Sequence, residues 1–104
     1  MTTATFIPSD AETTIAQIGL GNIMGISGGR ITVRETGVTL PVARGYSVTV
    51  DLAANDTYTV RRVYSRAGNV TIKGEYANVY CDELNERTYL ASCFVNVDMP
   101  KANA

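Results

Sequence analysis

Hydrophobic and polar residues alternate along the middle of the chain in three short stretches, at residues 46–52, 57–64 and 69–73, with turn-forming residues between them. In the first stretch every second residue is hydrophobic, which is the period of a strand that buries one face. Short strands of this kind in close succession are typical of an antiparallel β-meander. The residues expected to face the core are Tyr46, Val48, Val50, Val60 and Ile72.

A short helix is predicted ahead of the strands. Ser9 and Glu12 have the spacing of a capping box, in which the two side chains satisfy backbone N–H groups of a first helical turn. Ile15 and Ile18 continue a hydrophobic stripe at helical spacing until glycines end it. Residues 20–29 contain four glycines among residues that favour burial, so they predict either a compact buried turn or a second short helix.

Two more strands are predicted between this segment and the meander, at residues 30–34 and 38–42. Pro41 has no N–H group to donate to a ladder, so we expect the second of these to be an edge strand or a strand end. After the meander, residues 75–80 are expected to continue in extended or turning form.

The C-terminal part predicts a single helical turn at residues 82–87, where acids suit the start of a helix. Alternation then returns at residues 88–97 and predicts a final strand. The fold class that follows is α+β. It is a small antiparallel β-meander or partly open barrel with one N-terminal helix and one short C-terminal helical turn. The face expected for the last strand consists of Tyr89, Ala91, Cys93, Val95 and Val97.

The length of 104 residues is that of one domain, which we expect to span residues 1–104 with frayed tails at residues 1–8 and 99–104. The net charge of −1 gives no overall electrostatic reason to bind nucleic acid or an anionic membrane. No hydrophobic run approaches the roughly 20 residues of a membrane span, and the N-terminus lacks the basic region of a signal peptide. A cytoplasmic protein without membrane contact is therefore expected.

The residue types present argue against most enzyme classes. The chain has no histidine, which removes the commonest general base and the commonest metal ligand. Cys81 and Cys93 have no second pair to complete a zinc site, and without a secretory signal we expect reduced thiols rather than a disulfide. The glycines at residues 19–25 fail the dinucleotide fingerprint, because Met24 occupies the third glycine position. We expect no catalytic residue, no cofactor and no metal.

One local charge asymmetry suggests a contact surface. Residues 57–73 carry four cations and no acid, whereas residues 75–86 carry four acids and no cation. Cations bind phosphates and interleaved tyrosines stack on bases in single-strand nucleic-acid sites. The favoured alternative is an ordinary solvated hairpin with a β-bulge at residues 61–62, because the net charge is not positive. The candidate nucleic-acid contacts are Arg61, Arg62, Arg66, Lys73, Tyr58 and Tyr64.

Three segments, at residues 18–30, 56–63 and 73–84, resemble small proteins encoded by tailed bacteriophages. Those proteins carry an apolar glycine-rich segment, an Asp-x-Tyr-x-Val strand and a Val-Tyr-x-Asp-x-Leu segment in this order. The resemblance covers about residues 15–94 and implies a phage origin and the cytosol of a host cell, but no site residues. This chain departs from the family at residues 88–98, which predict a strand instead of a continued helix.

Two functions remain open. The one we favour is a non-enzymatic phage accessory protein that acts as a protein-interaction module on a host or phage protein. A small sheet with open edges often gains by pairing, so self-association, as in a homodimer, is expected with it. The alternative is a small nucleic-acid-binding module that uses the hairpin at residues 57–73.

Overall fold

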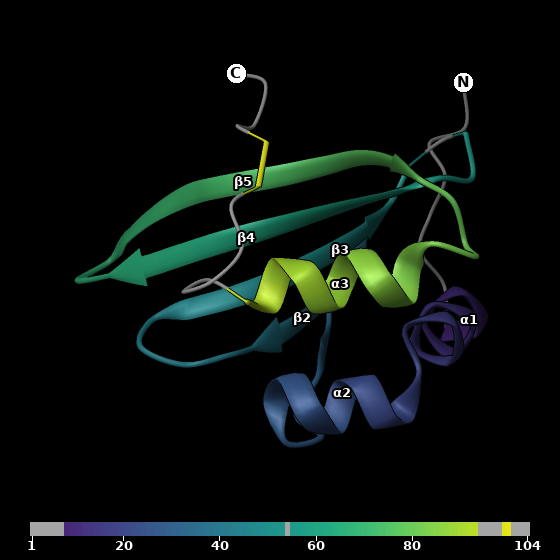
Figure 1. The fold of residues 1–104 in the computed structure, drawn as a ribbon, viewed down its shortest axis with the longest axis horizontal. Helices are drawn as coiled ribbons and strands as arrows, with labels where there is room; N and C mark the ends of the chain where they lie inside the picture. The colour runs from purple at the N-terminus through teal and green to yellow at the C-terminus, as the bar shows by residue number, and fades with distance from the viewer. Residues whose placement is uncertain (1–7, 54, 94–98, 101–104) are drawn as a thin grey trace.

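The computed structural model describes residues 8–53, 55–93 and 99–100 of the chain (Figure 1). Its strands form one open antiparallel sheet in which chain neighbours are also sheet neighbours, in the order β1-β2-β3-β4-β5. The predicted α+β class with an antiparallel meander is confirmed, and the sheet does not close into a barrel. The elements are α1 (Pro8–Ile18), α2 (Leu20–Ser27), β1 (Thr32–Val33), β2 (Gly37–Pro41), β3 (Tyr46–Leu52), β4 (Tyr58–Arg66), β5 (Asn69–Val79) and α3 (Leu84–Ser92).

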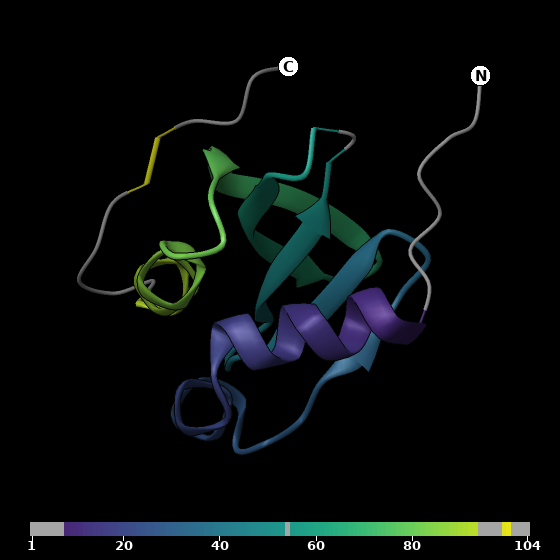
Figure 2. The same cartoon turned by 90° about the vertical axis from the view of Figure 1, so that its right-hand side faces the viewer.

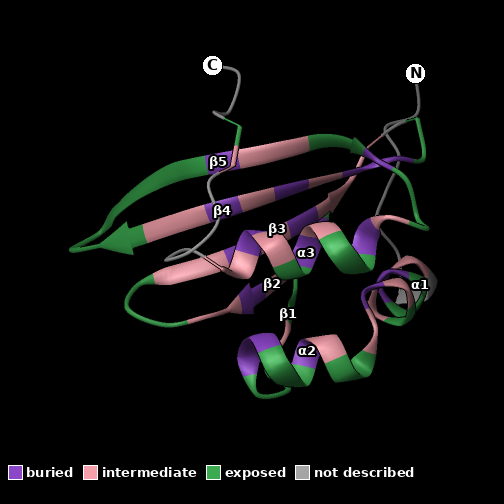
Figure 3. Ribbon diagram, viewed as in Figure 1, coloured by how far each residue is buried: buried purple, intermediate pink, exposed green. Residues whose placement is uncertain are grey.

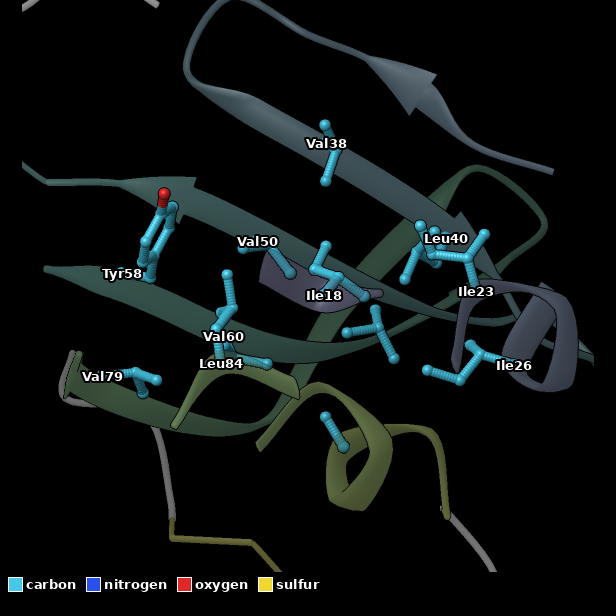
Figure 4. Close-up of a cluster of buried hydrophobic side chains, with 12 residues drawn as sticks. Ile18, Ile23, Ile26, Val38, Leu40, Val50, Tyr58, Val60, Val79 and Leu84 are labelled. Carbon is cyan, nitrogen blue, oxygen red and sulfur yellow. The ribbon is translucent and has the colours of Figure 1, made fainter. Parts of the chain in front are cut away.

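The three helices cover one face of the sheet (Figure 2) and enclose the core with it (Figure 4). Val48 and Val50 of β3 and Val60 of β4 are fully buried on this face, as the alternation predicts. Full burial of one such aliphatic side chain contributes about 1.5–3 kcal/mol. The core consists of Ile18, Ile23, Ile26, Val38, Leu40, Val48, Val50, Tyr58, Val60, Val79, Leu84 and Ala91.

The N-terminal helix forms, but its start differs from the predicted capping box. Helix α1 begins at Pro8. Proline is favoured at the first helical position, because a backbone N–H group at that position would have no acceptor within the helix. Ser9 therefore lies within the first turn rather than at the cap. Of the two interpretations of residues 20–29, the short helix is correct: α2 ends at Ser27 and is capped by Gly28, whose φ of 67° is in the left-handed region that glycine adopts readily.

Of the two strands ahead of the meander, the first is shorter than predicted and the second ends where the proline was expected to end it. Strand β1 comprises only Thr32 and Val33, where residues 30–34 had been predicted. Strand β2 ends at Pro41, which confirms the predicted strand end. It pairs with β3 along its whole length but with β1 at two positions only.

The β4–β5 pairing has two register shifts, both with an extra residue on β5, and the one at Arg62 lies on the strand opposite to the predicted one. Arg62 pairs with Gly74 and Val63 pairs with Ile72, so Lys73 is the extra residue and the bulge belongs to β5. The bulge turns Ile72 to the uncovered face, where its side chain is 46% exposed. The prediction that Ile72 faces the core is therefore wrong, because an extra residue reverses the alternation beyond it.

The predicted C-terminal strand is wrong as far as the structure describes it. Helix α3 extends over nine residues, through the positions where alternation had been expected to resume. Its buried residues are Leu84, Thr88 and Ala91, which share one face at helical spacing. Tyr89, predicted to share a face with Ala91, is exposed. The rest of that predicted strand, at residues 94–97, lies outside the described residues.

Two residues near the C-terminus lie against the second half of β5. The Glu75 N–H group donates to the carbonyl oxygen of Pro100 at 2.8 Å. Gly74 leaves the space that the Met99 side chain fills, because a Cβ atom at position 74 would lie 3.3 Å from both Cγ and Sδ of Met99. This contact covers part of the outer edge of β5. Of the tails expected at residues 1–8 and 99–104, Pro8 belongs to α1 and residues 99–100 contact β5, whereas residues 1–7 and 101–104 lie outside the described residues.

Candidate functional site

The six residues predicted to contact nucleic acid do not form one surface. Tyr58 and Arg62 belong to the helix-covered face of β4 and are only 4% and 6% exposed. The Thr14 hydroxyl donates to the Tyr58 hydroxyl at 3.3 Å. Arg62 donates from Nε to the carbonyl oxygen of Ala91 at 2.8 Å and from Nη2 to that of Leu90 at 3.2 Å. A cation suits the carbonyl end of a helix, so Arg62 joins the sheet to α3 instead of facing a ligand.

Arg61 lies on the uncovered face of the sheet, within a row of alternating charges. Its Nε is 2.6 Å from Oε1 of Glu75 and its Nη1 is 3.7 Å from Oδ2 of Asp51. Arg34, just after β1, extends the row with Nη2 at 3.0 Å from Oδ1 of Asp51. We call these four residues the charge row. Because each cation in the charge row faces an acid, the charge of Arg61 is balanced locally and attracts a phosphate group only weakly.

The sequence does not reveal the charge row, because its members are distant along the chain. Asp51, Arg61 and Glu75 meet only through the register of three strands, in which Arg61 pairs with Thr49 on one side and with Glu75 on the other. The alternation of β3 placed Asp51 on the polar face, and this was the only signal available. Ion pairs at partly exposed positions contribute about 0–1 kcal/mol each, so the row fixes side-chain positions more than it stabilises the fold.

The remaining three candidates lie near the end of the β4–β5 hairpin. Tyr64 packs on Tyr46, with ring centroids 4.9 Å apart, and Lys73 Nζ lies 5.6 Å from the centroid of the Tyr64 ring. Arg66 is exposed at the last position of β4. The structure thus brings together Tyr64 and Lys73 and leaves Arg66 at the tip, whereas Tyr58 and Arg62 are buried under the helices.

The outer edge of β5 is open over its first half. Residues 69–73 run along a hairpin end that projects beyond the helices (Figure 1), and all five are exposed (Figure 3). Within residues 8–53, 55–93 and 99–100, their backbone pairs only with β4, whereas the strand is covered further along by Pro100 at Glu75. We call residues 69–73 the free edge. Exposed strand edges of this kind are templates for pairing with another chain.

The backbone of the free edge directs hydrogen-bonding groups outward. The hairpin has a two-residue turn at residues 67–68, and both turn residues have positive φ. In such a hairpin the closing pair, here Arg66 and Asn69, is hydrogen-bonded, and bonded pairs alternate along the strands. This alternation leaves the N–H and C=O groups of Val70 and Ile72 pointing away from β4. The free edge can therefore receive one further strand.

The side chains of the free edge are suited to a strand and are apolar on one face. Val70 is 67% exposed and Ile72 is 46% exposed, and Ile72 pairs with Val63 of β4 on the uncovered face. We call Val63, Val70 and Ile72 the apolar patch. β-branched residues are enriched in strands because they pack well on a pleated surface. Contact with a partner would remove the apolar patch from water.

The opposite edge of the sheet is blunt by comparison. Strand β1 has two residues, and Arg34 directly after it folds back to donate to Thr39 Oγ1 at 2.6 Å and to the carbonyl oxygen of Val38 at 3.1 Å. Very short edge strands and charged side chains are the usual means of preventing edge pairing. The free edge of β5 is therefore the better of the two edges for receiving a strand.

An open cleft of about 520 Å³ lies beside the second half of β5 and the start of α3. Its charged groups contact one another: the Arg87 guanidinium lies 5.1 Å from the centroid of the Tyr76 ring and 3.7 Å from Oε2 of Glu83. Glu75 in the same cleft already pairs with Arg61. The cleft is lined by Glu75, Tyr76, Ala77, Asn78, Val79, Glu83, Arg87 and Pro100.

Neither cysteine is near a partner thiol. Cys81 and Cys93 are both free and flank the two ends of α3. Nine helical residues span about 13 Å, well beyond the 7 Å that a disulfide bridges between Cα atoms. Among the residues with described positions, no three Cys, Asp or Glu side chains gather closely enough to hold a metal ion.

None of the three described helices has the length and apolar content that crossing a membrane requires. Comparison of the chain with known protein families, curated proteins and solved structures finds no match.

Proposed function

We propose that this protein is a non-enzymatic interaction module that binds an extended segment of a partner protein by strand addition at the free edge. The observation that carries the proposal is the outward direction of the Val70 and Ile72 backbone groups on an exposed edge strand. In strand addition the backbone hydrogen bonds supply affinity and alternate side chains supply specificity. The apolar patch beside the edge gives the partner side chains a surface to contact.

The arrangement of charge favours a protein partner over nucleic acid. A single-strand site needs cations and rings on one groove. Here Arg61 is paired within the charge row, and Tyr58 and Arg62 are buried under the helices. Arg66 and Lys73 remain near the hairpin end, and two cations on a chain of net charge −1 give weak attraction for a polyanion.

The resemblance to small tailed-phage proteins gives the proposal its setting. We infer an accessory protein that acts in the cytosol of a host cell on a host or phage protein. The same resemblance suggests where a partner would be found, so the test is made in cells that express the chain.

A photo-crosslinking amino acid at position 72 tests the proposal. We expect it to capture a protein in expressing or infected cells, with unchanged yield after nuclease treatment. The matched control carries the same amino acid at Val33, which is also exposed and hydrophobic but lies on the two-residue strand at the opposite edge. Equal adducts at the two positions would contradict the assignment of the free edge. An adduct at position 72 that disappears after nuclease treatment would favour the nucleic-acid function.

A further inference from the structure

We infer that the strand received by the free edge is the free edge of a second copy of this chain, in antiparallel orientation about a two-fold axis at Thr71. This inference rests on the proposed function and names its partner. A two-fold axis at Thr71 places Asn69 opposite Lys73 of the second copy and Val70 opposite Ile72. The two sheets would join into one sheet of ten strands, twice the five that each copy contributes.

The order of side chains along the free edge is symmetric about Thr71. Outward from that residue the chain has Val70 and Ile72, then Asn69 and Lys73, so each apolar residue meets an apolar one and each polar residue meets a polar one. The only charge in the segment, Lys73, meets an amide and not its own copy. Like charges directly opposite destabilise a strand pair, and this register avoids them.

The backbone agrees with the same register. The outward N–H and C=O groups belong to Val70 and Ile72, and the antiparallel pairing about Thr71 sets these two residues opposite each other across the interface. Each Val70 would exchange two hydrogen bonds with Ile72 of the other copy, as a hydrogen-bonded antiparallel pair does. Thr71 would face its own copy as a non-hydrogen-bonded pair, which has the shorter Cα separation of about 4.5 Å. A register shifted by one residue would lose these bonds.

The boundaries of the free edge also fit a second copy. The segment is limited by the turn at residues 67–68 on one side and by the Glu75 to Pro100 hydrogen bond on the other. An extended peptide of another protein could pair with a strand of any length. The symmetric pair instead uses all five residues of the free edge and ends at both boundaries. On the uncovered face the apolar patches of the two copies would become continuous. Five residues per copy are fewer than the roughly 20–30 of a standard interface, so we expect a dimer of micromolar affinity.

Cysteine crosslinking tests the register. In a chain carrying Cys81→Ser and Cys93→Ser, we expect Thr71→Cys to form a covalent dimer on mild oxidation, because Cα atoms about 4.5 Å apart suit a disulfide. Ile72→Cys in the same background is the matched control. In the inferred register its two copies are separated by two residues along the strand, outside the range of a disulfide. Equal covalent dimer from the two variants would overturn the register.

Sedimentation of the unmodified chain tests the dimer itself. We expect a concentration-dependent dimer whose dissociation constant rises at least 10-fold with Ile72→Lys and stays unchanged with Val33→Lys. A chain that remains monomeric up to about 1 mM would overturn the inference, since that concentration lies well above a micromolar dissociation constant. If the photo-crosslinker at position 72 then captures a different protein, only the second copy is excluded and the interaction module stands. If it captures nothing, both fail.

Discussion

The substitution Gly37→Ala tests the strand register on which the two faces of the sheet depend. Gly37 is buried at the start of β2 and pairs with Asp51 of β3. A Cβ atom at this position would lie 2.7 Å from the Cα atom of Asp51 and 2.8 Å from the carbonyl carbon of Val50, and closer still to the Val50 carbonyl oxygen. These are backbone atoms of a central strand, which cannot rotate away as the end of a side chain can. The substitution must therefore separate β2 from β3 at this end.

The size of the effect follows from the bond that the separation breaks. The Leu52 N–H group of β3 donates to the Thr36 carbonyl oxygen at 2.9 Å, just before β2. One lost hydrogen bond of roughly 1 kcal/mol, with 1–3 kcal/mol for overpacking, gives about 2–4 kcal/mol. For a domain of this size, 1 kcal/mol corresponds to about 4–8 °C in Tm, so we expect a decrease of at least about 8 °C.

Thermal unfolding followed by circular dichroism measures this difference. The matched control is Gly25→Ala on α2, where no described atom other than those of the adjacent residues and the helix's own backbone lies within 4 Å of the added Cβ. Alanine is favoured over glycine in a helix interior, so this control should raise stability by about 0.5–1 kcal/mol. If Gly37→Ala unfolds at the same temperature as the unmodified chain, the pairing of β2 with β3 at Gly37 is refuted, and with it the placement of the charge row.

Three further substitution tests address the core, the charge row and nucleic acid. Val50→Asp buries an unpaired carboxylate, so it should lower the free energy of unfolding by more than about 3 kcal/mol in chemical denaturation. Thr49→Asp on the polar face should change that free energy by less than about 0.5 kcal/mol, and equal losses in the two variants would show that the two faces of β3 are exchanged. Arg61→Glu should destabilise by about 1–2 kcal/mol, since it sets a third acid between two others, while Arg66→Glu at the exposed tip should be nearly neutral in the same assay. Fluorescence anisotropy with a labelled single-stranded oligonucleotide at low salt should show no saturable binding at tens of micromolar protein, and binding abolished by Arg66→Glu with Lys73→Glu would instead restore the nucleic-acid function.

The meander could be predicted because β3 and the first half of β4 obey a period of two without interruption. The burial of Val48, Val50 and Val60 follows directly from that period. The bulge at Lys73 could not be predicted in the same way. Gly74 next to Lys73 is the kind of isolated strand glycine that often accompanies a bulge, but the effect of the extra residue on Ile72 depends on a register that only the paired strands define.

The pattern of residues 88–97 predicts a strand where the structure has the C-terminal helix through Ser92. Tyr89, Ala91 and Cys93 stand at alternate positions with Thr88 and Ser92 beside them, which matches a strand over a short window although Leu90 interrupts the polar positions. The helical period runs instead through Leu84, Thr88 and Ala91, and its middle member is polar. Because threonine is polar, the buried Thr88 does not add to a hydrophobic pattern, and the sequence does not show the buried face of α3.

The candidate site was only partly accessible to sequence reasoning. The basic residues of the hairpin could be located, but the division of Arg61 from Arg62 between two faces requires the alternation of β4 to continue through both. The sequence pattern predicts a β-bulge at residues 61–62, with the basic side chains of the hairpin all facing solvent. The free edge follows from topology, since any of the predicted strands could have been the last in the sheet.

Hydrogen exchange of individual amides as a function of protein concentration tests most directly whether the free edge pairs. The N–H groups of Val70 and Ile72 should exchange rapidly at low micromolar concentration and slow at least 10-fold at millimolar concentration, as the outward groups acquire partners. The Thr71 N–H group, directed toward β4, serves as the internal control and should exchange slowly throughout. Rapid exchange of Val70 and Ile72 at every concentration, with slowing at another surface instead, would contradict pairing at the free edge.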